Sequence, residues 1–571
     1  MYLKKIPQKS TGRVYLYIAE GYRDKNGKAK SKSVKKIGYV DELLSEYKDP
    51  IAHFTEVAKQ MTEEREKTRE LIFKISADAE VERGAANRKN YGHIVFSKIY
   101  HELEIDRFLD NKRRHENFKY NSESIMRLLL FGRLLYPRSK LGTFEIRDKF
   151  FDNFKFTIDD IYECLSHIDK ISAGLQQFLH EKVTEQYDRD TSLVYYDVTN
   201  YYFEIDKEDD FRKRGAAKDG RGDPIVQMGL VLDKSSIPIT YRMFSGNTHD
   251  SQTLMPMLKE IRKKYNVDRI VVVADKALNS GDNIAFNTIL GDGYIFSKSV
   301  RGASVGFKEY ALDQTGYSEG EGYRRKSRVV PMKIDVTVAG RGKSRKTKEV
   351  DLDQKQIIVY SEKYAQRSRY KRQQLLSKAV DLIKNPSKYR KATAYGAAGY
   401  VNNIQFDKET GKVLNTGEEL KLDLEKIKEE EKYDGYYAIV TSELDTPDNL
   451  IIEAYHGLWR IEESFKITKS TLEARPIFLR TENHINAHFM ICFIALLIAR
   501  LTEIRLGNKY NIEKIIDTLR KVECSHISQN HYLFDFVDEV TEDINAAFEL
   551  NIGRKILTLG EIKRNLGFVK K

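Results

Sequence analysis

Residues 455–469, with the sequence YHGLWRIEESFKITK, carry polar side chains at a regular spacing. Tyr455, Trp459, Glu462, Lys466 and Lys469 follow one another at intervals of four, three, four and three residues, so a helix would place them on one face. Apolar residues at the same spacing form a second face that we expect to be buried. An ordinary amphipathic surface helix with an ion pair between Glu462 and Lys466 would also give this pattern, because such pairs contribute only about 0.2–0.5 kcal/mol.

Two aspartates lie in stretches whose amino-acid composition is typical of buried strands. The stretch TSLVYYDVTNYYFEI, residues 191–205, is rich in Val, Tyr and Phe and has Asp197 at its middle. The stretch DRIVVVADKALNSGDN, residues 268–283, predicts a second buried strand that ends at Asp275. A buried charge is costly unless it has a partner. For each acid alone, a helix cap or a salt bridge is a sufficient explanation, so the interpretation depends on the three acids together.

The order of predicted elements brings these acids together. Residues 191–300 predict a strand, a hairpin, a helix, a strand, a short helix and a strand. The first and fourth strands can lie side by side in a mixed sheet, which would place Asp197 and Asp275 at one edge, and a packed helix can add Glu462. Mg²⁺ prefers oxygen ligands, and two such ions about 3.5–4 Å apart promote phosphodiester displacement. The acids therefore predict a nuclease or strand-transfer site.

Three stretches carry a resemblance to a known family. VYYDVTNYYF, VVVADKAL and above all YHGLWRIEESFKITK resemble the DDE transposases of bacterial insertion sequences. The branch in question has a Y-(2)-R-(3)-E-(6)-K signature and a β-rich insertion before the glutamate. The resemblance covers roughly residues 190–500. It implies an α/β fold whose RNase H-like mixed-sheet catalytic core is interrupted by the insertion.

The resemblance also implies roles for individual residues. Asp197, Asp275 and Glu462 would be the catalytic residues and would hold two Mg²⁺ or Mn²⁺ ions, while Tyr455 and Lys469 would contact phosphates of the transposon end. Leu458 stands where the signature has arginine, so Arg460 or Lys466 is the alternative source of that charge. Lys276 follows the second aspartate where arginine is usual.

Further side chains are expected to contact DNA. Trp459 can stack on a displaced base, or it can pack between helix and sheet. Basic runs at 324–348 and 367–372 are either solvated surface or phosphate contacts, and their concentration in one inserted segment favours phosphate. In the first run these contacts are expected from Arg324, Arg325, Lys326 and Arg328.

Composition supports a nucleic-acid partner. The 571 residues carry a net charge of +12 with a pI near 9.1, which suits a polyanion. The start of the chain has no apolar run typical of a signal peptide, and the run FMICFIALLIA, residues 489–499, is too short to span a bilayer. Three separate cysteines with no CxxC pair argue against a disulfide framework or a cysteine zinc site. We expect a cytoplasmic bacterial protein, nucleoid-associated when bound to DNA, with no membrane contact.

The sequence divides into six predicted regions. A basic β-hairpin arm with a turn at Asn26-Gly27 is followed by a helical DNA-binding module, and a C-terminal helical region is a candidate for dimerisation. The predicted boundaries are 1–50 for the arm, 51–185 for the helical module, 186–300 for the first part of the core, 301–435 for the basic β-rich insertion, 436–505 for the second part of the core with the glutamate helix, and 506–571 for the C-terminal region.

The resemblance implies cut-and-paste transposition on double-stranded DNA. The protein would bind the terminal inverted repeats, cleave them, and join the freed ends to target DNA, with a homodimer in the synaptic complex. A plain metal-dependent nuclease would not need some 185 residues of arm and helices before Asp197. A transposase-derived DNA-binding regulator without strand transfer would not need three converging acids. Both remain the alternative hypotheses.

Overall fold

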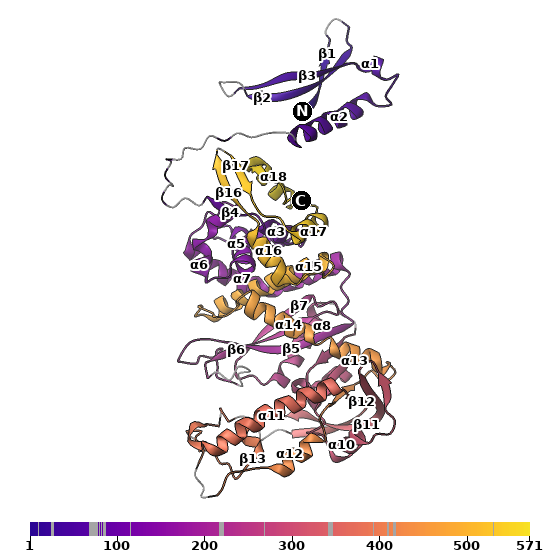
Figure 1. Cartoon of the computed structure of the whole chain (residues 1–571), viewed down its shortest axis with the longest axis vertical. Coiled ribbons are helices and arrows are strands. Elements are labelled where there is room, and N and C mark those ends of the chain that lie inside the picture. The colour runs from indigo at the N-terminus through magenta and orange to yellow at the C-terminus, as the bar shows by residue number, and fades with distance from the viewer. Residues whose placement is uncertain are drawn as a thin grey trace. The chain divides into compact units, whose positions relative to one another are not determined.

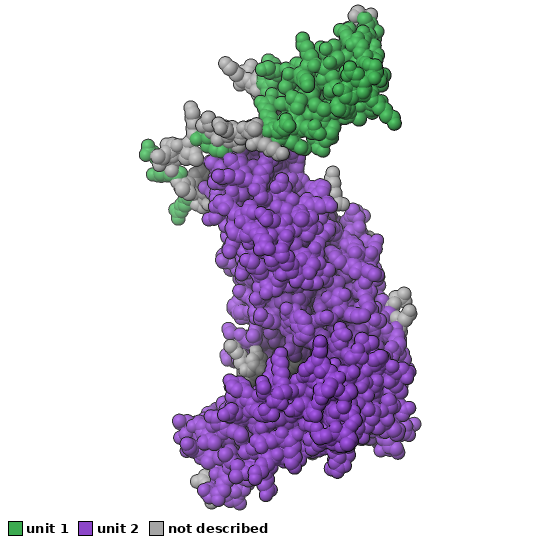
Figure 2. All heavy atoms as spheres, turned by 45° about the vertical axis from the view of Figure 1, so that its right-hand side comes forward, with its two compact units in different colours: residues 1–83 green, residues 84–571 purple. Residues whose placement is uncertain are grey.

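The computed structural model describes the chain in two compact units, Met1–Arg83 and Gly84–Lys571 (Figure 2). The described residues are 1–571 without 9–10, 24–27, 68–72, 74–77, 79, 81–82, 84–86, 115, 216–221, 266, 268, 341–345, 392, 395, 408–409, 415–417, 529 and 571.

The first unit is a three-stranded antiparallel sheet with a helix. Its strands are β1 (Tyr2–Pro7), β2 (Val14–Arg23) and β3 (Ala29–Tyr39), in the order β1-β2-β3, followed by α1 (Val40–Leu43) and α2 (Pro50–Lys67). The helix α2 belongs to this unit because Arg65 pairs with Glu20 of β2 at 2.7 Å and Ala58 is fully buried. The predicted boundary at residue 50 therefore differs from the structural one, and the predicted turn Asn26-Gly27 lies outside the described residues.

The second unit is built on a mixed nine-stranded sheet (Figure 1). The strand order is β10-β11-β12-β15-β9-β8-β5-β6-β7, in which only the β5–β8 and β8–β9 pairs are parallel. The bounds are β5 Leu193–Tyr202, β6 Ile225–Leu232, β7 Pro238–Ser245, β8 Val271–Ala274, β9 Gly293–Lys298, β10 Ser318–Gly320, β11 Tyr323–Ala339, β12 Lys346–Tyr360 and β15 Tyr436–Thr441. The predicted element order over 191–300 is present, with α8 (Leu254–Lys264) and α9 (Gly281–Ile289) as its helices.

Alternate residues of the central strands bury opposite faces of this sheet. Tyr196 and Val272 belong to a core that includes side chains of α8 and α9, whereas Tyr195 and Val273 belong to the core formed with the helices after β15. Those helices are α13 (Asp448–His456), α14 (Trp459–Lys466), a π-helical turn (Ile467–Thr471) and α15 (Glu482–Arg505). Within the described chain α15 alone has the length and hydropathy of a membrane span, and 94% of its apolar 18-residue stretch is buried inside the protein, as expected for a core helix.

The predicted insertion extends the sheet instead of standing apart from it. The inner half of β12 pairs with β15, with Ile357 opposite Ile439, and is buried, while the outer half is largely exposed. The insertion also contains α10 (Val305–Leu312), α11 (Glu362–Lys384), α12 (Leu424–Glu431) and the short pair β13 (Val401–Asn402) and β14 (Lys421–Leu422).

Helices that precede the nine-stranded sheet in the sequence and helices that follow it share one core. The upstream helices are α3 (His93–Glu102), α4 (Ile105–Arg113), α5 (Ser122–Leu135), α6 (Lys140–Glu145) and α7 (Ile158–Tyr187), and the downstream helices are α16 (Ile512–Lys521), α17 (Glu539–Phe548) and α18 (Leu559–Phe568). Four short strands, β4 (Arg88–Asn90), β16 (Glu523–Ser528), β17 (His531–Phe534) and β18 (Ile556–Thr558), form a second sheet in the order β18-β17-β16-β4. The C-terminal region predicted as helical therefore contains three short strands besides its helices, and these strands are too short to show a clear alternation in the sequence.

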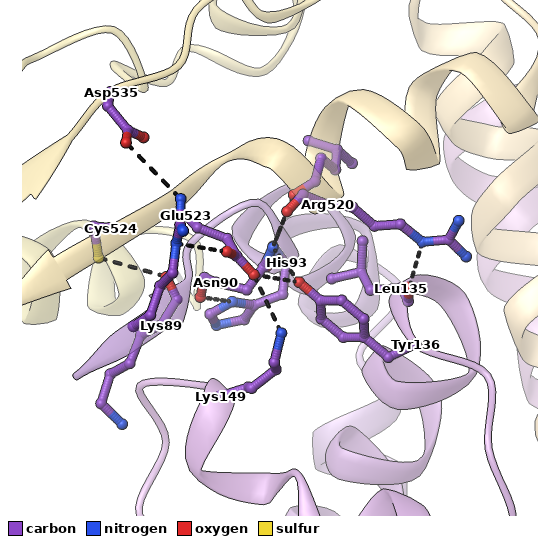
Figure 3. A network of polar contacts seen from close by, with 12 residues as sticks. Lys89, Asn90, His93, Leu135, Tyr136, Lys149, Arg520, Glu523, Cys524 and Asp535 are labelled. Carbon is purple, nitrogen blue, oxygen red and sulfur yellow. Dashed lines mark hydrogen bonds and ion pairs between the residues drawn. The ribbon is translucent and has the colours of Figure 1, made fainter. Parts of the chain in front are cut away.

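A polar network fixes the start of the second unit to its C-terminal sheet (Figure 3). The carboxylate of Glu523 accepts hydrogen bonds from Tyr136 Oη at 3.0 Å and Lys149 Nζ at 3.3 Å, and it pairs with Arg88 at 2.9 Å. Asn90 donates to the carbonyl of Leu519 at 2.8 Å. Tyr136 and Lys149 are thereby joined to a carboxylate that lies 387 and 374 positions further along the sequence.

Candidate active site

Asp197 and Asp275 lie level with each other on neighbouring parallel strands. Tyr195 of β5 is the register partner of Val273 of β8. Asp197 lies two residues further along β5, and Asp275 lies two residues after Val273, directly beyond the end of β8. Because side chains alternate along a strand, both carboxylates point to the face of Tyr195 and Val273, with a strand spacing of about 4.8 Å. The fold therefore brings these two predicted site residues to one face of the sheet on neighbouring chain segments.

Asp275 is oriented by a serine of the next strand. It follows directly after β8, and its Oδ1 accepts a hydrogen bond from Ser297 Oγ of β9 at 2.7 Å. Both aspartates are partly exposed. The pair is accordingly at a surface that a substrate can reach.

The helix after α13 crosses the face of β5 above Asp197. Arg460 donates to Tyr195 Oη at 3.4 Å near the start of the strand, and Lys469 Nζ donates to Thr199 Oγ1 at 2.6 Å beyond Asp197. Gly457 permits this close approach, because a Cβ there would lie 2.0 Å from Tyr195 Oη. We call residues 459–471, which comprise α14 and the π-helical turn, the Glu462 helix.

Glu462 lies on the exposed face of this helix. Among the described residues, no group of three or more His, Cys, Asp and Glu side chains is arranged to hold a metal ion. Burial raises the pKa of Tyr455 to about 12, and the negative charges of Asp275 and Glu462 contribute to this rise, so both carboxylates lie near the Tyr455 hydroxyl. The donor types suit Mg²⁺, and the two aspartates share a face, but the three acids do not form a closed cluster.

Tyr455 and Asp275 line a groove of about 1020 Å³ between the sheet and α11. Three exposed cations of α11, at intervals of four residues, lie along it: Lys363, Arg367 and Lys371. Seven tyrosines also line this basic groove: Tyr323, Tyr364, Tyr400, Tyr433, Tyr436, Tyr437 and Tyr455. The run 367–372 in the sequence indicated part of this cationic surface. Lys363 in the groove, Ser297 beside Asp275 and Thr199 beside Lys469 were missed, because their places depend on the fold.

Other residues of the opening stretch point elsewhere. Trp459, which is 57% exposed, and Arg460 line a separate pocket of about 1130 Å³ that does not include Asp275. Arg460 also donates to the carbonyl of Lys234 at 2.9 Å. Lys466 pairs with Glu513 at 3.4 Å, and Leu458 is buried in the core. The predicted single polar face is thus divided, since Trp459 and Arg460 lie toward the start of β5 and Lys466 toward α16.

The predicted phosphate-binding cluster on β11 is also divided. Strand alternation sends Arg325 to the opposite face from Arg324, Lys326 and Arg328. Lys326 is only 4% exposed and donates to the carbonyls of Asp313 and Thr315. Arg328 donates to Gln356 at 3.1 Å, and Arg324 lies over the ring of Tyr360. The structure therefore gives Lys326 other partners than the predicted phosphate, because tyrosines and carbonyls cover this face of the strand.

Comparison with family models gives two matches. Residues 3–72 match the model described as IS1634 family transposase, N-terminal domain, and residues 315–498 match the model described as Transposase DDE domain. The chain carries a DDE transposase domain. The range of this DDE domain contains Tyr455, Glu462 and Lys469, and it begins after Asp275. A DDE domain implies an RNase H-like catalytic core, which agrees with the mixed sheet.

Two other comparisons add little to the DDE domain match. No curated protein matches the chain. A solved structure described as Mos1 transposase paired-end complex with left transposon end aligns at 10% identity with a TM-score of 0.14, a value too low to relate the two folds. The alignment covers 42% of this chain and 66% of that chain, so the chain spans just under two thirds of that relative.

Proposed function

We propose that the protein is the transposase of an insertion sequence, which binds terminal inverted repeats and catalyses metal-dependent cleavage and strand transfer. The observation that carries this proposal is the placement of Asp197 and Asp275 on one face, below a helix that bears Glu462 and Lys469. Nothing in a purely DNA-binding regulator requires this arrangement. The DDE domain match supports the same reaction class.

Asp197, Asp275 and Glu462 are the residues that would hold two Mg²⁺ or Mn²⁺ ions. When bound, such ions activate the attacking oxygen and stabilise the leaving oxygen. Glu462 would complete the site when DNA fills the space beside the aspartates. Ser297 holds the Asp275 carboxylate in place through its hydrogen bond.

Two side chains of this chain would hold the scissile phosphate. The ammonium of Lys469 lies beside Thr199, two residues from Asp197, where it can pair with a non-bridging phosphate oxygen. The phenol of Tyr455 is protonated at neutral pH, as that of an ordinary tyrosine is, and burial raises its pKa further, so its hydroxyl can donate to a second oxygen. A water oxygen then adds to phosphorus as the 3′ oxygen leaves, and the freed 3′ hydroxyl attacks a target phosphodiester with release of the target's 3′ oxygen.

The basic groove would receive the DNA end. Lys363, Arg367 and Lys371 cover about 12 Å along α11, enough to follow successive phosphates toward Asp275. We propose two copies of the chain in a synaptic complex, each with one end, in the bacterial cytoplasm at the nucleoid. These assignments rest on the charge of the groove and on the reaction class.

The test is to incubate the protein with Mg²⁺ and DNA fragments that carry the flanking inverted repeats. The proposal expects double-strand cleavage at the element ends and joined products with target DNA. Cleavage at random positions without joining would favour a plain nuclease. Specific binding without any cleavage would favour a DNA-binding regulator.

A further inference from the structure

The turn that ends the Glu462 helix is held by side chains of α5, in the helical module, and of α15. Three consecutive backbone carbonyls, those of Leu472, Glu473 and Ala474, accept hydrogen bonds from two buried residues. Arg133 of α5 donates through Nη1 to Leu472 O at 3.1 Å and Glu473 O at 2.9 Å. His488 of α15 contacts Ala474 O through Nε2 at 2.9 Å.

This turn needs external support because its backbone is unusual. The last turn of the helix is a π-helix, closed by Leu472 N to Ile467 O at 2.9 Å and Ala474 N to Thr468 O at 2.9 Å. Glu473 has φ of 43°, a left-handed conformation that is unfavourable for residues other than glycine. Such strain persists only when surrounding contacts enforce it. Lys469 lies inside this π-helical turn, so the turn sets the direction of its side chain.

A lysine favours the tautomer of His488 that this contact requires. A carbonyl can only accept a hydrogen bond, so Nε2 of His488 carries a proton. Burial lowers the pKa of His488 and keeps the ring neutral, so Nδ1 carries no proton and is an acceptor. Lys140 of α6 supplies the matching donor to Nδ1 at 3.3 Å. Burial also lowers the pKa of Lys140 to about 7, but its nitrogen carries N–H in either form. Cys492 Sγ adds a weak contact with Nε2 at 3.7 Å.

We propose that Arg133, Lys140 and His488 form a carbonyl clamp whose members are positioning residues for Lys469. The clamp acts through the turn 472–474, which lies directly after the lysine, and holds the ammonium at Thr199 beside Asp197. This inference rests on the proposed role of Lys469 in cleavage. It assigns the helical module a second task besides DNA contact, namely the alignment of the active site.

The clamp is tested with matched variants on one helix. Arg133→Lys keeps the charge but cannot reach all of its acceptors, and Arg127→Lys is the control, because Arg127 is equally buried in α5 and pairs with Glu123 and Asp152 instead. Single-turnover cleavage by Arg133→Lys should fall about 10- to 100-fold, as expected for a displaced catalytic group, while end binding stays unchanged. Equal cleavage by the two variants would overturn the clamp.

A second pair keeps the test decisive if Arg133→Lys fails to fold. His488→Gln retains a donor for Ala474 O and should cleave almost normally, whereas His488→Leu lacks one and should lose cleavage but keep end binding. Equal rates for these two variants would overturn the clamp. A fully active Asp197→Asn would instead contradict the proposed function, so the two failures are distinguishable.

Discussion

Lys469 Nζ donates a 2.6 Å hydrogen bond to Thr199 Oγ1, two residues along β5 from Asp197. The helix that carries the third acid is thereby connected to the strand that carries the first. The same ammonium lies 5.5 Å from the ring of Tyr201. Sequence spacing alone predicts that Lys469 follows Glu462 by two helical turns, but its contact with the strand depends on the π-helical turn.

Lys469→Ala should lower cleavage more than DNA binding, because the lost group would hold the scissile phosphate and only one phosphate contact is removed. Lys466→Ala on the same helix is the control, since Lys466 pairs with Glu513. Gel-shift and single-turnover cleavage assays on one end substrate measure both properties. Equal cleavage by the two variants would argue against a role for Lys469 in the reaction.

Replacement of Lys363, Arg367 and Lys371 by alanine should weaken DNA binding with little sequence dependence. Each phosphate contact contributes about 0.9 to the slope of log affinity against log salt on duplex DNA, so the triple variant should flatten that slope by roughly 2–3. Lys378 and Lys384, which are on α11 but outside the groove lining, provide the control substitutions. A slope equal to that of the control would place the DNA elsewhere.

Lys326→Met should destabilise the fold by about 1 kcal/mol, because two partly buried carbonyls lose their donor. Its effect on the salt slope should be close to zero, in contrast to the α11 variant. Thermal unfolding and a binding titration check the two statements. A normal unfolding temperature with a flattened slope would restore Lys326 as a phosphate contact.

Acidification should destabilise the second unit through His93. Burial lowers the pKa of this histidine to about 4 from an ordinary value of 6.5. Between these values the unfolded chain binds a proton that the folded chain excludes, so stability falls as pH falls, by up to about 3 kcal/mol at pH 4. His93→Asn should flatten the dependence of unfolding on pH, and His249→Asn, at an exposed position, should not. Identical profiles would contradict this assignment.

The central strands were predictable from sequence, and several contacts around them were not. Val-rich and Tyr-rich stretches identify β5 and β8, because strands buried on both faces read as continuous apolar runs. The strands β4 and β16 are short and pair across more than 430 residues, which leaves no local signal. Lys326 reads as part of a solvated basic run, and only the packing of Tyr310 and Tyr317 around it reveals its burial.

The candidate site, too, was predictable from the sequence only in part. The two aspartates could be placed from the order of strands, since parallel neighbours in a mixed sheet share an edge. The exposure of Glu462, the divided polar face and the basic groove depend on the rotation of one helix and on the path of α11, which residue spacing does not determine.

The most direct test of the account is cleavage of inverted-repeat DNA in Mg²⁺ by the wild type and by Asp197→Asn, with end binding measured on the same substrate. The substitution replaces a charged carboxylate by a neutral amide and leaves the basic groove intact. The account therefore predicts that cleavage is abolished while end affinity is retained. Cleavage by Asp197→Asn at the wild-type rate would contradict the assignment of the active site.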